Sequence, residues 1–183
     1  MRGSVSFFML CLLLTVAAAL SSCASATGSV GDALKARYRR SLIEINDPRT
    51  QGRIVSPGTV LILQAAGLPA KKFRVVQANL KSPRFHFRDY ARVDVDPDGK
   101  ITVERGDFTL ERGARLIVLN VKVENDRVRL LTHTRAPVGF VDRTAAYGCT
   151  EFVFHFNPSA LETGDVAIVQ DRIENLLALA TAN

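Results

Sequence analysis

Several features that mark common classes of enzymes and membrane proteins are missing from this chain of 183 residues. It has no glycine-rich phosphate loop, no Cys and His set with metal-ligand spacing, and no internal repeat. Because it has only 12 Gly and 7 Pro, it is neither collagen-like nor dominated by linkers. Its 47% apolar and 23% charged residues are typical of a globular protein, and the length favours a single domain.

Long hydrophobic runs are also missing, since the apolar run from Phe7 to Leu20 has only fourteen residues. As a helix it would be about 21 Å long, which is short of the ~30 Å hydrocarbon core of a bilayer. The run follows a short start that carries Arg2, and this arrangement is typical of a cleaved signal peptide. We therefore expect residues 1–22 to be removed and exclude them from the fold.

The apolar run ends at Leu20-Ser21-Ser22-Cys23, which resembles the lipobox of bacterial lipoproteins. The resemblance implies a diacylglyceryl group on the Cys23 thiol, cleavage before Cys23, and acylation of the new amino terminus, for example by palmitate. Two or more chains anchor a protein stably, because each buried CH₂ contributes ~0.8 kcal/mol. Ala24, rather than Asp, follows the cysteine, and in this family that implies sorting to the outer membrane. Simple secretion after cleavage near Ala24-Ser25-Ala26 and an uncleaved anchor are the alternatives.

The cysteine count excludes an intramolecular disulfide in the mature chain. Cys11 leaves with the signal peptide and Cys23 carries the lipid, so Cys149 stands alone. An unpaired thiol in an exported protein is normally buried or paired with another chain. The catalytic alternative makes Cys149 a nucleophile with His133 or His155 as its base, which requires hydrogen-bonding reach.

The start of the mature chain predicts a tether and a helix. Residues 23–31 are small and polar after the lipidated cysteine, as in a flexible tether. Asp32 can cap a helix through about Ser41, with one apolar stripe formed by Leu34, Tyr38 and Leu42. The other faces of this helix carry Lys35, Arg37, Arg39 and Arg40. These cations either bind anionic headgroups or form a solvated face.

From about residue 53 to 156 the apolar period changes to two, and turn residues recur about every ten positions, which indicates strands. The clearest hairpin joins Val121–Glu124 to Arg127–Leu130 through Asn125 and Asp126. Because these two residues tolerate a positive φ, they suit a two-residue hairpin turn. Lys122 and the other charged residues of this hairpin then share its outer face.

The chain ends in an amphipathic segment that predicts a second helix over 165–180, capped by Asp165 or Thr163. Its wide apolar stripe suggests that it covers one face or the open end of the sheet. The predicted fold is α+β and mostly β. It is a small antiparallel open barrel or bent sheet of about seven strands, flanked by an N-terminal and a C-terminal helix in one domain over 32–183.

One segment resembles the start of a calcium-binding EF-hand loop, because Asp94, Asp96 and Asp98 precede Gly99. The resemblance fails at the twelfth position, where Arg105 replaces the bidentate Glu of that family. Pro-Asp-Gly is also a tight-turn sequence between two strand-like flanks. The segment is therefore either a plain hairpin tip or a weak calcium site on that tip.

Positive charge is concentrated in the first half of the mature chain. Residues 32–92 carry 13 Lys or Arg and 4 acids, a net +9, whereas residues 93–183 carry 10 and 14, a net −4. A polyanion or anionic lipid can bind if the cations of one stretch gather on one face, and a self-neutralised surface is the alternative. That stretch contains Lys71, Lys72, Arg74, Lys81, Arg84 and Arg88.

Two functions follow from these observations. The leading hypothesis is a non-catalytic lipoprotein of the bacterial envelope, anchored by its lipid, whose domain faces the periplasm and binds an envelope protein, an anionic lipid or a wall polymer at the membrane surface. We expect no cofactor, no resident metal, no catalytic residue and no nucleic-acid partner. The alternative is a small periplasmic hydrolase or thiol enzyme that uses Cys149 with His133 or His155.

Overall fold

A computed structural model describes residues 29–44, 53–73, 90–141, 143–162 and 164–181, so the predicted signal peptide and Cys23 lie outside the described residues. The elements are, in chain order, α2 (Val30–Arg37), β1 (Leu42–Glu44), β2 (Arg53–Ser56), β3 (Val60–Leu63), β4 (Leu68–Phe73), β5 (Ala91–Val95), β6 (Ile101–Val103), β7 (Phe108–Leu110), β8 (Arg115–Val123), β9 (Arg127–Thr134), β10 (Gly139–Val141), β11 (Thr144–His155), α4 (Pro158–Glu162), α5 (Val166–Glu174) and β12 (Leu177–Leu179).

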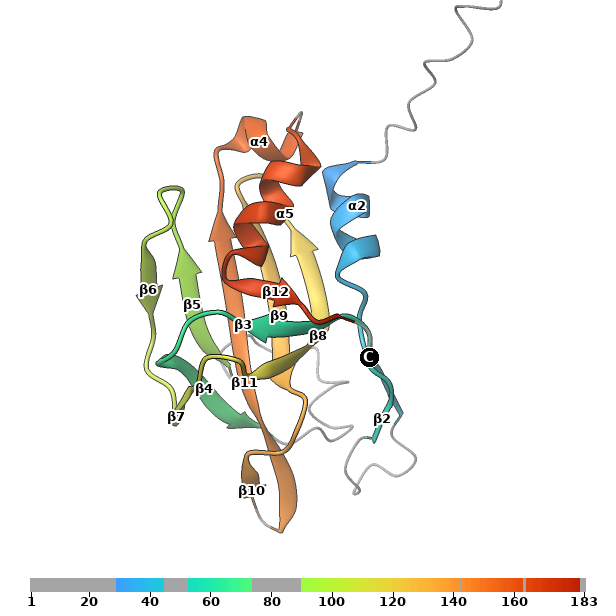
Figure 1. Cartoon of the computed structure of the whole chain (residues 1–183), viewed down its shortest axis with the longest axis vertical. Coiled ribbons are helices and arrows are strands. Elements are labelled where there is room, and N and C mark those ends of the chain that lie inside the picture. Colours follow the sequence, from blue (N-terminus) through green and yellow to red (C-terminus); the bar gives the residue numbers. More distant parts are fainter. Residues whose placement is uncertain (1–28, 45–52, 74–89, 142, 163, 182–183) are drawn as a thin grey trace, which may run out of the picture.

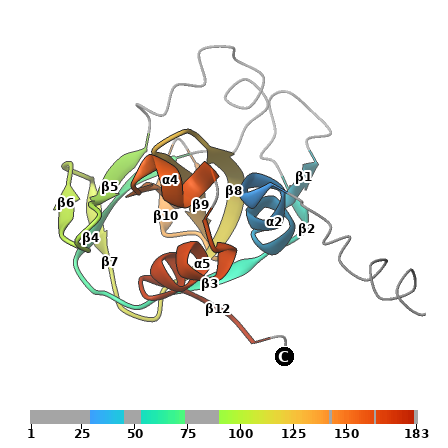
Figure 2. The same ribbon diagram turned by 90° about the horizontal axis from the view of Figure 1, so that it is seen from above.

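The main sheet is a curled, open half-barrel, which confirms the mostly β prediction (Figures 1 and 2). Seven strands follow one another along it in the order β12-β3-β8-β9-β11-β4-β7, and each neighbouring pair is antiparallel. Strands β5, β6 and β10 branch from this path, and β1 and β2 form a separate ribbon. The antiparallel prediction fails at one place, because β5 pairs with β11 in parallel.

Strand β11 is the longest element and occupies the centre of the sheet. Its twelve residues span about 40 Å at ~3.3 Å per residue. One edge pairs with β9, while the other pairs first with β4 and then with β5. Gly148 lets the sheet stay close-packed here, because a Cβ at this position would lie 2.7 Å from Cζ of Phe108 and 2.9 Å from Cγ2 of Thr134.

The alternation of side chains along β11 separates two packed faces. Phe152 and Phe154 point into the main core with Leu130 of β9. This core also takes up buried residues of α2, α4 and α5, and Figure 2 shows α4 and α5 within the curl of the sheet and α2 beside β8. Cys149 and Leu131 belong to a smaller cluster on the opposite face.

The first helix differs from its prediction at both ends. It covers Val30–Arg37 instead of running from Asp32 to Ser41, and its N-cap is Ser29, whose Oγ accepts the N–H of Asp32 at 3.2 Å. Leu34 and Tyr38 are buried as the stripe predicts. Leu42 is 60% exposed, because the helix has already ended and Leu42 begins strand β1.

The last element was predicted wrongly in part. The helix begins after Asp165, whose side chain accepts the N–H of Ala167 as an N-cap, but it ends at Glu174 instead of near residue 180. Residues 177–179 form β12 and pair with β3 at one end of the sheet path. Leu177 is fully buried in this strand. None of the described helices is long and apolar enough to cross a membrane.

The predicted β8–β9 hairpin is present, and Glu124 N–H donates to the carbonyl of Arg127 at 2.9 Å across the turn. The expected positive φ at Asn125 and Asp126 is wrong, since Arg143 is the non-glycine residue with positive φ in the described part of the chain. Further along the hairpin, an irregularity between Val118 and Asn120 shifts the register by one residue. The open end of the hairpin is therefore set by this bulge as well as by the turn.

Candidate functional site

Cys149 and His133 are the two candidate catalytic residues that the fold brings together. They are direct partners across the β9–β11 ladder, and both side chains are fully buried. The thiol contacts the carbonyl of Tyr147 at 3.5 Å, and burial raises the thiol pKa well above its ordinary value. Because catalysis requires the thiolate, this surrounding suits a structural cysteine.

The His133 imidazole is held among aromatic side chains. Its ring stacks between Tyr90 and Tyr147, with both centroids at 5.9 Å, and Phe73 lies at the same distance. Nε2 lies 3.2 Å from the Tyr90 hydroxyl, whereas Nδ1 has no hydrogen-bond partner. Burial lowers the pKa of His133 from 6.5 to about 3. A neutral ring without a bond to Cys149 does not form the nucleophile–base pair of a thiol enzyme.

His155, the other candidate base, lies elsewhere on the same strand. It is six residues from Cys149, or about 20 Å along β11. Its Nε2 is 2.7 Å from Oδ1 of Asp94, and Asp94 also accepts two hydrogen bonds from Arg92. The hydrogen bonds from Arg92 and His155 outweigh burial and lower the pKa of Asp94. His155 is thus part of an ionic network across β5 and β11.

The Asp-rich segment is a hairpin tip between β5 and β6. Oδ1 of Asp96 accepts the backbone N–H of Asp98 and of Lys100, and Gly99 has a φ of +85°. Asp94 is instead engaged by Arg92 and His155. In the described ranges no three His, Cys, Asp or Glu side chains are grouped to hold a metal ion. The hairpin interpretation accounts for the observed contacts.

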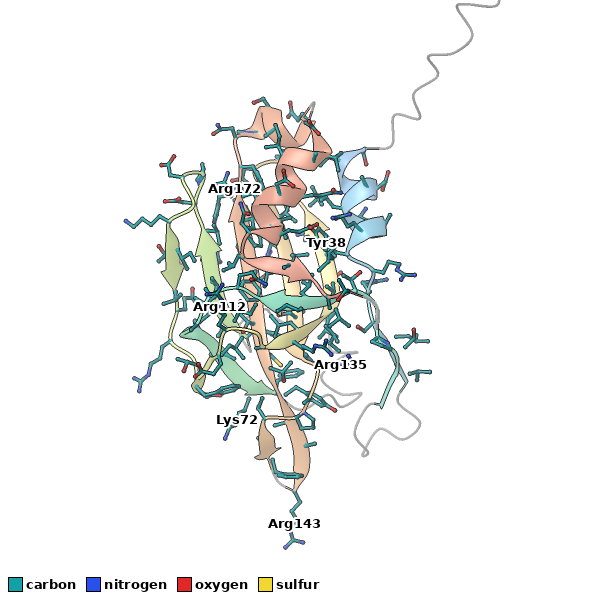
Figure 3. The ribbon with its side chains drawn as sticks, viewed as in Figure 1. Tyr38, Lys72, Arg112, Arg135, Arg143 and Arg172 are labelled. Atoms are coloured by element: carbon teal, nitrogen blue, oxygen red, sulfur yellow. The ribbon has the colours of Figure 1, made fainter. Side chains whose placement is uncertain are left out.

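A surface groove lies beside the end of α2, and we call it the arginine groove. Its central section has a volume of about 590 Å³. It is lined by Arg37, Arg39, Gly58, Thr59, Val60, Arg115, Arg135, Leu179, Ala180 and Thr181. Adjoining hollows share Arg39 on one side and Arg115 with Arg135 on the other, and Lys35 and Arg40 line the first of them. Figure 3 shows Arg135 near the β8–β9 end of the sheet, on the same side as Tyr38.

The backbone on the α2 side of the groove is fixed by a set of close contacts. Arg39 N–H donates to Oγ1 of Thr59 at 2.9 Å, and this hydroxyl donates to the Arg37 carbonyl at 2.7 Å. Gly58 approaches so closely that a Cβ there would lie 2.1 Å from the carbonyl oxygen of Arg39. The segment that carries Arg39 is therefore held in place before any ligand binds.

Helix α2 is tied to α5 by an ion pair at the rim of the groove. The Arg37 guanidinium makes two hydrogen bonds to Glu174, and the Tyr38 hydroxyl lies 3.2 Å from the same carboxylate. The hydrogen bonds that Arg37 donates to Glu174 raise the pKa of Arg37, and burial raises the pKa of Tyr38. Glu174 thus neutralises Arg37 and leaves the positive charge of the groove to its other arginines.

Arg39, Arg115 and Arg135 have no carboxylate partner in the part of the chain that the structure describes, whereas Arg92, Arg127 and Arg129 each have one. Arg135 N–H donates to the Arg115 carbonyl at 2.7 Å, so the two residues lie opposite each other at the end of the β8–β9 pair, and both line the groove. Like charges in this position repel each other. An anion placed between them would relieve the repulsion and accept the bidentate hydrogen bonds that guanidinium groups make to phosphate or carboxylate.

The sequence predicted part of this groove. It singled out the cations of the first helix, and the structure places Arg37 and Arg39 in the groove and Lys35 and Arg40 in the hollow beside it. It missed Arg115 and Arg135, although counting outward from the predicted hairpin turn places them near each other. Of the other predicted cationic group, Lys71 and Lys72 lie in β4, and Arg74, Lys81, Arg84 and Arg88 lie outside the described residues, as does Cys23.

Comparison of this chain with protein-family models, with curated proteins and with solved structures found no match.

We expect Cys149 to resist alkylation in the native protein. Labelling of its peptide near neutral pH should be at least about a thousandfold slower than in the unfolded chain. The buried thiol reacts only when the surrounding structure opens, and this opening costs about 5 kcal/mol. Mass spectrometry of the Cys149 peptide measures this rate with and without denaturant. Equally rapid labelling in both states would favour the thiol-enzyme alternative.

His133 should make the stability of the protein depend on pH. Its pKa is lower in the folded state, about 3 against 6.5. The contribution of neutral His133 to the free energy of unfolding is therefore fully present above pH 6.5 and is lost as the pH falls towards 3. In this window the free energy of unfolding should fall by about 1.4 kcal/mol per pH unit relative to a His133→Phe variant. Denaturant titrations of both proteins measure the difference, and parallel pH profiles would contradict it.

Proposed function

We propose that the protein is a membrane-anchored lipoprotein of the bacterial envelope with a non-catalytic binding role. The arginine groove carries this proposal, because it concentrates guanidinium groups that the described carboxylates leave unpaired. Its ligand is an anionic group of an envelope component, whether a protein, a lipid or a wall polymer. The lipobox-like Leu20-Ser21-Ser22-Cys23 supplies the anchor, and the domain faces the periplasm from the outer membrane.

The thiol-enzyme alternative has one observation in its favour, the pairing of Cys149 with His133 across the ladder. Three others weigh against it. Both side chains are fully buried, Nδ1 of His133 has no hydrogen-bond partner, and burial shifts both pKa values away from the thiolate and imidazolium forms. The hydrolase form of the alternative, with His155, would need a nucleophile beside the His155–Asp94 pair.

The anchor is tested by the intact mass of the protein extracted from the membrane fraction of an expressing bacterium. We expect the mass of residues 23–183 plus a diacylglyceryl group and an acyl chain, because the lipobox resemblance implies both. A Cys23→Ala variant should lack the added mass of the lipid, and a Cys149→Ala variant is the matched control that should retain it. A soluble wild-type chain that begins near Thr27 would contradict the lipoprotein proposal.

A further inference from the structure

The position of the lipid limits where the membrane lies. This step rests on the proposed function, since it takes Cys23 as the lipidated residue. Cys23 is six residues before Ser29, so the chain between them spans at most about 21 Å at ~3.5 Å per residue. The groove opens at the far end of α2, whose eight residues cover about 12 Å. The anchor and the groove can therefore meet the same bilayer surface.

The charges around the domain favour one orientation over another. The end of the molecule that holds the start of α2, the end of α4 and the start of α5 carries exposed carboxylates at Asp32, Glu162 and Asp165 (Figure 1). If this end of the domain faced the bilayer, the anionic surface would repel these carboxylates. A domain that lies on its side brings the arginine groove to that surface instead.

We infer that the arginine groove binds the phosphate groups of anionic phospholipids in the bilayer that holds the anchor. Arg115 and Arg135 form the centre of this headgroup site, and Arg39 lines the groove on the α2 side. Guanidinium groups bind phosphate through paired hydrogen bonds, and a phosphate here offsets the repulsion between two adjacent cations. The groove is open and wide enough for a headgroup, with a volume of about 590 Å³.

The test uses the lipidated protein reconstituted into vesicles of phosphatidylcholine alone or of phosphatidylcholine with phosphatidylglycerol. Backbone hydrogen exchange is measured by mass spectrometry in the segments 113–118 and 134–138. We expect exchange in both segments to slow when phosphatidylglycerol is present. The Arg115→Gln/Arg135→Gln double variant should lose this effect.

A Lys100→Gln/Arg105→Gln double variant is the matched control. It removes the same charge from the β5–β6 ribbon and the loop that follows it, which lie on the opposite side of the domain from α2 (Figures 1 and 2). It should respond to phosphatidylglycerol like the wild type. Protection of Cys149 from alkylation shows that each variant is folded.

Several results would overturn the inference. They are equal exchange in the two vesicle types, a response that the groove variant retains, or the same protection from inorganic phosphate added to phosphatidylcholine vesicles, which would identify a site for free phosphate. If the extracted protein carries no lipid, the proposed function fails by itself. The groove is then tested by sedimentation of the soluble protein with phosphatidylglycerol vesicles. Two basic residues contribute about 30-fold in affinity, so the groove variant should bind about 30-fold more weakly, and equal sedimentation would overturn the inference.

Discussion

The pairing of both edges of β11 is the constraint on which the rest of the structure depends. One edge binds β9 and the other binds β4 and β5, so this strand joins segments from three parts of the chain into one sheet. Its alternating side chains place Phe152 and Phe154 in the main core and Cys149 on the other face. The pairing also fixes β9, and through β9 it fixes the position of Arg135.

Side chains are buried on both faces of β11, but by apolar packing on one face and with an ion pair on the other. On the core side, apolar residues meet the helices, and burial of each large side chain contributes about 1.5–3 kcal/mol. On the other side, Glu151 is 1% exposed and is neutralised by Arg129, whose nitrogens lie 2.6–2.7 Å from its Oε1. Burial raises the pKa of Glu151 against the opposing effect of Arg129. Arg129 and Glu151 therefore neutralise each other, in contrast to the arginines of the groove that have no carboxylate partner.

Local patterns predicted the parts of the fold that depend on local contacts. The β8–β9 hairpin follows from its alternation and its turn, and the Asp165 cap follows from one side chain. The strand β12 could not be predicted, because its Leu-Ala-Leu sequence suits a helix or a strand and only pairing with β3 decides between them. The parallel β5–β11 pair likewise depends on residues distant in sequence. The groove was half predictable, since the α2 cations are a local run, whereas Arg115 joins them only through tertiary contacts.

The groove and the proposed lipid anchor together lead to the central proposal, that this face of the domain contacts phospholipid. Photocrosslinking in living cells tests it most directly, with a photoreactive amino acid in place of Ala136, which lines the hollow beside Arg115 and Arg135, or of Thr102 on β6 as the control. The account predicts a phospholipid adduct, identified by mass, at position 136 and none at position 102. Protein adducts alone at position 136, or equal lipid adducts at both positions, would contradict it.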